Sequence, residues 1–168
     1  MNNRIYLDYN ATTPCEQEVV DHMLPFFNET YGNPSSAHHT YGWLAKEVIL
    51  DSTKIIAKTL GVAADDLIYT SGATESINMI LKSFSNKFES VGNHIITCKT
   101  EHKAVLDTCN FLEKYEGLSV TYIDVDDKGL VDLDQLKKAI RPETILISIM
   151  HSNNETGIIQ PLKKIRQI

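Results

Sequence analysis

The chain has 168 residues, a formal net charge of −6 at pH 7 and 42% hydrophobic residues. These values are typical of about one ordinary globular domain, and the acidic balance argues against nucleic acid as the main partner. No apolar run reaches the length of a membrane span and no CxxC motif joins the three cysteines, so we expect a cytoplasmic protein with reduced thiols and no membrane contact.

The first part of the sequence predicts one strand and then helices. Arg4–Asp8 alternates apolar and polar residues, as a half-buried strand does. A helix should follow, and Pro25 should kink or shorten it. Its inner face would carry Val19, Val20, Met23, Leu24 and Phe27. After a turn-rich loop, a long amphipathic helix is expected over Thr40–Leu60, with Gly61 as its C-cap.

The remainder of the sequence alternates short apolar runs with helical periodicity. Strands are expected at Asp66–Tyr69, His94–Cys98, Val120–Val125 and Thr144–Met150. Helices are expected after Gly72, over Lys103–Glu116, and from Asp132, where Gln135 completes a capping-box pattern. This alternation predicts an α/β fold with a mainly parallel sheet and flanking helices.

Three polar clusters follow predicted strands, and ligands of open α/β sheets bind beyond the carboxyl ends of the strands. The clusters are Ser71–Thr74, Thr100–His102 and His151–Gly157. The first joins a glycine turn to a helix start, which suits a phosphate because the first N–H groups of a helix are unpaired and carry a partial positive charge. Three such clusters on one edge suggest a shared pocket.

Each cluster also has a simpler structural interpretation. Thr74 could merely cap its helix, and His102 could hydrogen-bond as a neutral ring where its helix begins. Asn153 and Asn154 could be turn formers. Glu101 and Glu155 could be paired carboxylates for acid–base catalysis, or they could cap helices or remain solvated.

The remaining histidines and cysteines offer less. His38 and His39 resemble half of a metal site, but no cysteine or carboxylate lies at a supporting spacing, so no metal is expected. Cys98 and Cys109 fit a core strand and a helix face, whereas Cys15 follows a proline turn and is expected to be exposed.

Five motifs, in this order along the chain, closely resemble those of the cysteine desulfurases of the bacterial housekeeping or nitrogen-fixation type. They are Tyr6–Pro14, Gly32–Ser36, Thr70–Ser76, Thr100–Leu106 and Met150–Gly157. The resemblance implies the fold of the aminotransferase-like enzymes that depend on pyridoxal 5'-phosphate, with an incomplete large domain. Residues 1–14 would then belong to the small domain, and residues 15–168 to the N-terminal part of the cofactor-binding large domain.

The resemblance also implies roles for particular residues. Ala73 and Thr74 would hold the cofactor phosphate, and His102 would be the catalytic residue that stacks on the pyridine ring and moves protons. Asn154 would hydrogen-bond the phenolic oxygen of the ring. The complete homodimeric enzyme would transfer sulfur from L-cysteine to its own cysteine as a persulfide, giving L-alanine. The sulfur would serve an iron–sulfur scaffold or another acceptor protein.

The sequence departs from the family in what it lacks. The Ser-Gly-His-Lys motif that carries the cofactor-binding lysine is absent, and none of the three cysteines lies in the motif of the sulfur acceptor. We therefore expect the N-terminal part of a desulfurase that is inactive by itself. One alternative is a selenocysteine lyase or a different aminotransferase-like enzyme. An alternative of another class is a catalytically silent module for dimerisation or interaction.

The family fold makes one prediction about topology. Three strands, at residues 95–98, 120–123 and 145–150, should pair in parallel with Ile95–Cys98 in the middle. Leu67–Thr70 would be remote from them and left without a neighbour, which is costly for a buried strand. The chain alone should then be marginally stable, dimeric or prone to aggregate.

Overall fold

The computed structural model describes residues 4–88 and 90–168. The chain divides into two compact units, Met1–Tyr69 and Thr70–Ile168, which are treated separately below. Residues 1–3 of the segment predicted to belong to a small domain lie outside the described residues. The assignment of residues 1–14 and 15–168 to two domains of a longer enzyme stays a prediction.

The first unit is helical. Its elements are α1 (Gln17–Met23), α2 (Pro25–Asn28), α3 (Thr40–Leu60) and the 3₁₀ helix η1 (Ala64–Asp66). Pro25 begins α2 and so interrupts the predicted first helix, as expected. The bounds predicted for α3 are confirmed, since His39 Nδ1 accepts the Gly42 N–H at 3.3 Å and Gly61 ends the helix with φ 70°.

Two predicted strands in this unit are wrong. Neither Arg4–Asp8 nor Asp66–Tyr69 is a strand, and the side chains of Leu7 and Ile68 are 86% and 71% exposed. A strand exists only when its backbone hydrogen-bonds to a neighbour. No strand pairing involves these residues within the described part of the chain, so the prediction that Leu67–Thr70 would have no neighbouring strand is confirmed. Alternation of apolar residues does not supply such a neighbour.

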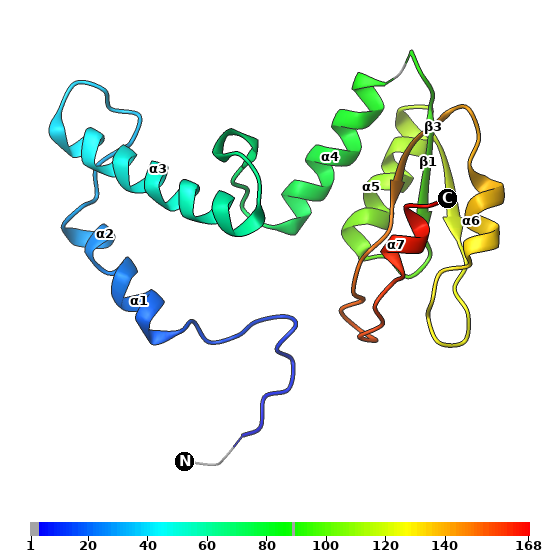
Figure 1. The fold of residues 1–168 in the computed structure, drawn as a ribbon, viewed down its shortest axis with the longest axis horizontal. Helices are drawn as coiled ribbons and strands as arrows, with labels where there is room; N and C mark the ends of the chain where they lie inside the picture. The colour runs from blue at the N-terminus through cyan, green and yellow to red at the C-terminus, as the bar shows by residue number, and fades with distance from the viewer. Residues whose placement is uncertain (1–3, 89) are drawn as a thin grey trace. The chain divides into compact units, whose positions relative to one another are not determined.

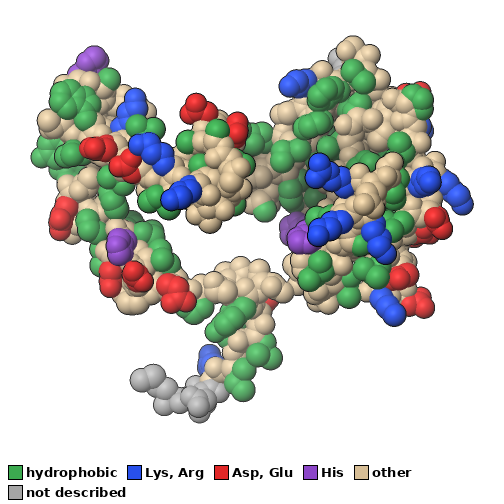
Figure 2. Space-filling model, viewed as in Figure 1, with side chains coloured by type: hydrophobic (Ala, Val, Ile, Leu, Met, Phe, Trp, Pro, Cys, Tyr) green, Lys and Arg blue, Asp and Glu red, His purple; other side chains and the backbone are tan. Residues whose placement is uncertain are grey.

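Hydrophobic side chains of this unit lie on its surface. The described residues of α1 and α2 include none that is buried, so the predicted inner face of the first helix is open. Figure 2 shows hydrophobic side chains over the surface of α3. Those exposed on this helix are Tyr41, Trp43, Leu44, Val48, Ile49, Leu50, Ile55, Ile56 and Leu60. We call these nine residues the α3 apolar surface.

The second unit is the predicted α/β structure. Its elements are α4 (Ala73–Lys87), β1 (His94–Cys98), α5 (Lys103–Tyr115), β2 (Ser119–Ile123), α6 (Leu133–Ala139), β3 (Thr144–Ser148) and α7 (Leu162–Ile165). The strands pair in parallel in the order β2-β1-β3, so the prediction that β1 lies in the middle is confirmed (Figure 1). The second and third strands each end two residues earlier than predicted.

Alternate residues of β1 bury against opposite layers of helices. Ile95 joins a core with α4 and α5, whereas Ile96 joins one with α6. The first core contains Leu81, Val105, Cys109 and Leu112, and the second contains Ile123, Val131 and Leu136. Figure 1 shows α5 and α6 on opposite sides of the sheet. Cys98 and Cys109 are buried and Cys15 is exposed, as the sequence indicates.

Candidate functional site

The helix α4 begins at the predicted glycine turn. Gly72 precedes it with φ 158° and ψ −179°, a backbone conformation that residues with a side chain rarely adopt. No side chain caps this end among the described residues, and nothing lies within 4 Å of where a Cβ on Gly72 would stand. The first N–H groups of the helix, at Ala73 and Thr74, are therefore accessible to an anion.

The two hydrogen-bond donors of Ser71 are already engaged by a neighbouring carboxylate. Its backbone N–H and its hydroxyl donate to Glu75 Oε2 at 2.6 and 2.7 Å, and these hydrogen bonds lower the pKa of Glu75. Ser71 is thus less suited to hold a phosphate than Ala73 and Thr74. Thr74 is an exposed residue of the first turn. The interpretation of Thr74 as a cap is wrong, because Gly72 is the N-cap residue of α4.

His102 lies just beyond the carboxyl end of β1, as the N-cap residue of α5. Its Nδ1 accepts the Ala104 N–H at 3.0 Å. A nitrogen that accepts a hydrogen bond carries no proton, so the neutral ring bears its hydrogen on Nε2. His102 is exposed. The cap fixes the ring orientation and does not exclude a role toward a ligand.

Glu101 is buried, unlike its neighbours Thr100 and His102. Its carboxylate accepts the backbone N–H of Met150, just beyond the end of β3. Burial raises the pKa of Glu101, and the hydrogen bonds from the Met150 and His102 backbones oppose that rise. Glu101 therefore joins two loops, and sequence reasoning missed this because Met150 is far away along the chain.

Asn153 organises the third cluster. Its Oδ1 accepts the backbone N–H groups of Glu155 and Thr156, each at 2.9 Å, as an Asx turn does. Its Nδ2 also reaches the Thr100 carbonyl oxygen at 2.9 Å, on the loop that carries His102. The exposed Asn154 lies within this turn, and its Nδ2 donates to Glu155 Oε1 at 3.1 Å.

These hydrogen bonds bring two of the three clusters together. The loop after β1 and the loop after β3 contact each other at the carboxyl edge of neighbouring parallel strands. The helix α4 packs on α5 and ends near the start of β1, so it runs against the strands and begins toward that same edge (Figure 1). Neither described cavity is lined by Ala73, Thr74, His102 or Asn154, so a common pocket stays a prediction.

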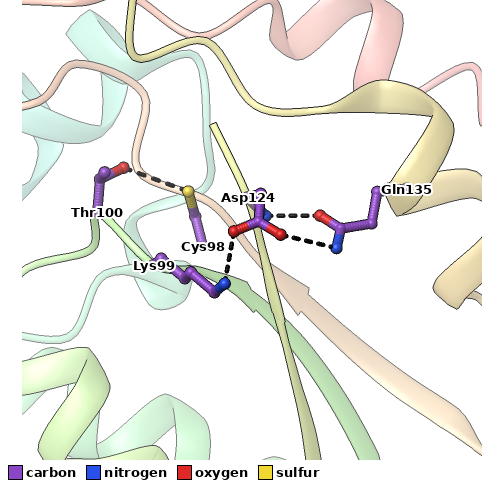
Figure 3. A network of polar contacts seen from close by, with 5 residues as sticks. All are labelled: Cys98, Lys99, Thr100, Asp124 and Gln135. Carbon is purple, nitrogen blue, oxygen red and sulfur yellow. Dashed lines mark hydrogen bonds and ion pairs between the residues drawn. The ribbon is translucent and has the colours of Figure 1, made fainter. Parts of the chain in front are cut away.

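A second polar network lies between β1 and β2 at the same edge. Lys99 Nζ and Gln135 Nε2 both donate to the Asp124 carboxylate, and Gln135 Oε1 accepts the Asp124 N–H at 2.6 Å (Figure 3). The hydrogen bonds from Lys99 and then from Gln135 lower the pKa of Asp124. The predicted capping box is half right: Asp132 caps α6, but Gln135 binds Asp124 instead of the N-cap backbone.

The remaining predictions concern a membrane span, a metal site and the histidine pair His38 and His39. No helix of residues 4–88 and 90–168 is long and apolar enough to cross a membrane. In the same residues, no three His, Cys, Asp or Glu side chains gather as a metal ion would need. His39 caps α3 instead.

The chemistry of the donors fits pyridoxal 5'-phosphate, the cofactor that the sequence resemblance implies. An uncapped helix N-terminus with a hydroxyl suits the phosphate, and an exposed imidazole suits one face of an aromatic ring. The Asn154 amide suits a phenolic oxygen because it hydrogen-bonds without adding charge. The carboxylate of Glu75 would oppose a phosphate, but it already accepts hydrogen bonds from Ser71.

Comparisons with known proteins agree with this chemistry. Residues 5–168 match the aminotransferase class V family. The cysteine desulfurase IscS of Dictyoglomus turgidum is 50% identical over 168 residues, which are 100% of this chain and 42% of that protein. IscS of Neisseria meningitidis is 47% identical over 98% of this chain and 40% of its own length. The chain thus spans about two fifths of these curated relatives.

Solved structures give the same result. A NifS-like protein superimposes with a TM-score of 0.93 at 43% identity, over 98% of this chain and 44% of that one. SspA, solved in complex with cysteine, superimposes with a TM-score of 0.89 at 41% identity, over 96% of this chain and 46% of its own. The predicted α/β fold of the aminotransferase-like enzymes is confirmed by these relatives.

Proposed function

Because the chain belongs to the aminotransferase class V family, we propose that it forms the N-terminal part of a cysteine desulfurase that depends on pyridoxal 5'-phosphate. The observation that carries the proposal is the 50% identity with a cysteine desulfurase along the whole chain. The open N-terminus of α4 and the polar loops after β1 and β3 support it, because they supply the donors that the cofactor needs.

Four residues would hold the cofactor in this proposal: Ala73 and Thr74 at the phosphate, His102 against the ring, and Asn154 at the phenolic oxygen. When bound, pyridoxal 5'-phosphate supplies an electron sink for bond cleavage in an amino acid. His102 would hold and move a proton at Nε2, since Nδ1 is already an acceptor of the Ala104 N–H. The substrate of the whole protein would be L-cysteine and its products L-alanine and an enzyme persulfide.

The sulfur acceptor would be none of Cys15, Cys98 and Cys109, because none of them lies in the motif that carries it. Burial raises the pKa of the Cys109 thiol to about 11, and Cys98 lies in the middle strand. A sulfur-accepting cysteine needs an accessible thiolate, which neither residue offers. We further propose a cytoplasmic homodimer that passes its sulfur to an iron–sulfur scaffold or another acceptor protein.

The proposal is tested by titrating the protein with pyridoxal 5'-phosphate and following the absorbance of the cofactor. We expect saturable binding that Thr74→Val and Asn154→Ala each weaken by about tenfold or more, since a hydrogen bond to a charged group contributes about 1.5–3 kcal/mol. Thr59→Val, which removes an exposed threonine hydroxyl on α3, is the matched control. An absence of saturable binding, or equal losses in all three variants, would contradict the proposal.

A further inference from the structure

The loops after β1 and β3 are joined by two hydrogen bonds that cross between them. One runs from the Met150 N–H to the Glu101 carboxylate, and the other from Asn153 Nδ2 to the Thr100 carbonyl oxygen at 2.9 Å. We call this pair of hydrogen bonds the loop clamp. His102 follows Glu101 directly, and Asn154 follows Asn153, so the clamp stands next to both proposed cofactor-binding side chains.

Glu101 is a charged residue in a buried position. The residue is only 8% exposed, and a buried carboxylate loses hydration that a hydrophobic residue of similar size would not need. A well-packed apolar residue in place of a buried charged group is often neutral or stabilising, so stability alone does not require a carboxylate here. What the carboxylate provides instead is directional: it accepts backbone N–H groups from Met150 and from His102 and so relates the two loops.

Asn153 completes the same arrangement from the other loop. While its Nδ2 reaches Thr100, its Oδ1 holds the backbone N–H groups of Glu155 and Thr156. The turn that contains Asn154 is therefore fixed to the loop that contains His102 by one side chain. Its amide uses both its donor and its acceptor, so neither a carboxylate nor an aliphatic residue could replace it fully.

We propose that Glu101 is a positioning residue which, together with Asn153, fixes His102 relative to Asn154. A ligand that binds both side chains then meets them already oriented, and does not have to order two separate loops on binding. The consequence for the cofactor rests on the function proposed above, whereas the effect on the two loops does not.

The experiment compares the protein with Glu101→Ala, Glu101→Gln and Asn153→Ala by ¹⁵N and ¹³C NMR. Asp107→Asn, which changes an exposed carboxylate on α5, is the matched control. In Glu101→Ala we expect faster hydrogen exchange at the Met150 amide and shifted or broadened signals of His102 and Asn154. Glu101→Gln keeps an acceptor oxygen for Met150 and should restore these signals, which a general loss of packing would not allow.

The same proteins are then titrated with pyridoxal 5'-phosphate. We expect affinity about tenfold weaker in Glu101→Ala and Asn153→Ala and nearly unchanged in Glu101→Gln and Asp107→Asn, as is typical when a supporting residue is removed. Unchanged His102 and Asn154 signals in Glu101→Ala would overturn the inference. If those signals change but no protein, wild type included, binds the cofactor, the proposed function fails while the positioning role of Glu101 stands.

Discussion

His94, the first residue of β1, shows how one side chain can depend on a whole sheet. It is fully buried, and its two ring nitrogens lie 2.8 Å from the hydroxyls of Thr144 on β3 and Thr121 on β2. The ring therefore connects all three strands. Burial is the main cause that lowers the pKa of His94; Arg141 lowers it further, and Glu143 opposes both.

This arrangement predicts how stability depends on pH. The folded protein favours the neutral ring, so the unfolded chain binds more protons as the pH falls below the ordinary histidine pKa of about 6.5. The free energy of unfolding should fall with pH in that range, by at most about 1.4 kcal/mol per pH unit from this residue. Urea unfolding at pH values from about 5 to about 7, a range that includes this pKa, measures the slope.

His94→Gln should reduce the slope, whatever it does to the stability itself. The exposed His38, changed to glutamine, is the control for the loss of a histidine elsewhere in the chain. An equal slope in wild type and His94→Gln would show that His94 is not the group that titrates.

At the scale of elements, α6 is attached to the sheet through Gln135. Its amide donates to one Asp124 oxygen and accepts the Asp124 N–H, next to the Lys99 ion pair. The sequence pattern assigned Gln135 to a capping box, where glutamate serves as well as glutamine. The two assignments therefore make opposite predictions for one substitution.

Gln135→Glu should destabilise the protein more than Gln135→Ala does. A glutamate would place a second carboxylate against Asp124 and would lose the donor that Nε2 provides at 3.1 Å. The urea midpoint of both variants measures the effect, with the exposed Lys138→Ala on the same helix as control. A midpoint for Gln135→Glu at or above that of the wild type would restore the capping-box assignment.

At the scale of the whole molecule, much apolar surface is exposed. The α3 apolar surface carries nine large hydrophobic side chains that are exposed, and large exposed apolar patches often mark interaction sites. Among the described residues, the sheet of the second unit has three strands in the order β2-β1-β3, so β2 and β3 are its edges. Edge strands carry unpaired backbone groups. Both features favour association.

We therefore expect the chain to associate as its concentration rises. Sedimentation velocity over a range of concentrations should show dimers or larger species, and Ile55→Lys together with Leu60→Lys should shift the distribution toward monomer. A charge on this surface disfavours its burial against another molecule. Val91→Lys, at an exposed apolar position of the second unit, is the control. A monomer at every concentration that unfolds reversibly in one transition would contradict the prediction.

The chain alone should also lack desulfurase activity. It has no Ser-Gly-His-Lys motif to anchor the cofactor, and none of its three cysteines lies in the motif of the sulfur acceptor. Covalent steps cannot be replaced by binding contacts alone. Incubation with L-cysteine and pyridoxal 5'-phosphate should give alanine and sulfide no faster than free cofactor does. Alanine formation that depends on the protein and is lost in His102→Ala would refute this.

The sequence by itself determined the local features of this protein. The bounds of α3, its glycine C-cap, the start of α5 and the whole of β1 follow from periodicity and caps, which involve residues only a few positions apart. The parallel order with β1 in the middle came from the family resemblance rather than from any pattern of residues. The four proposed cofactor-binding residues came from the same source, and their roles stay predictions.

Only the tertiary structure decided which residues far apart in the chain would meet. Leu7 and Ile68 have the pattern of strand residues, yet a strand needs a backbone partner that their sequence does not encode. Glu101 binds Met150, and Gln135 binds Asp124 in preference to its own helix. These choices depend on which loops the sheet brings side by side, because hydrogen bonds form between groups that are close in space, whatever their separation in sequence.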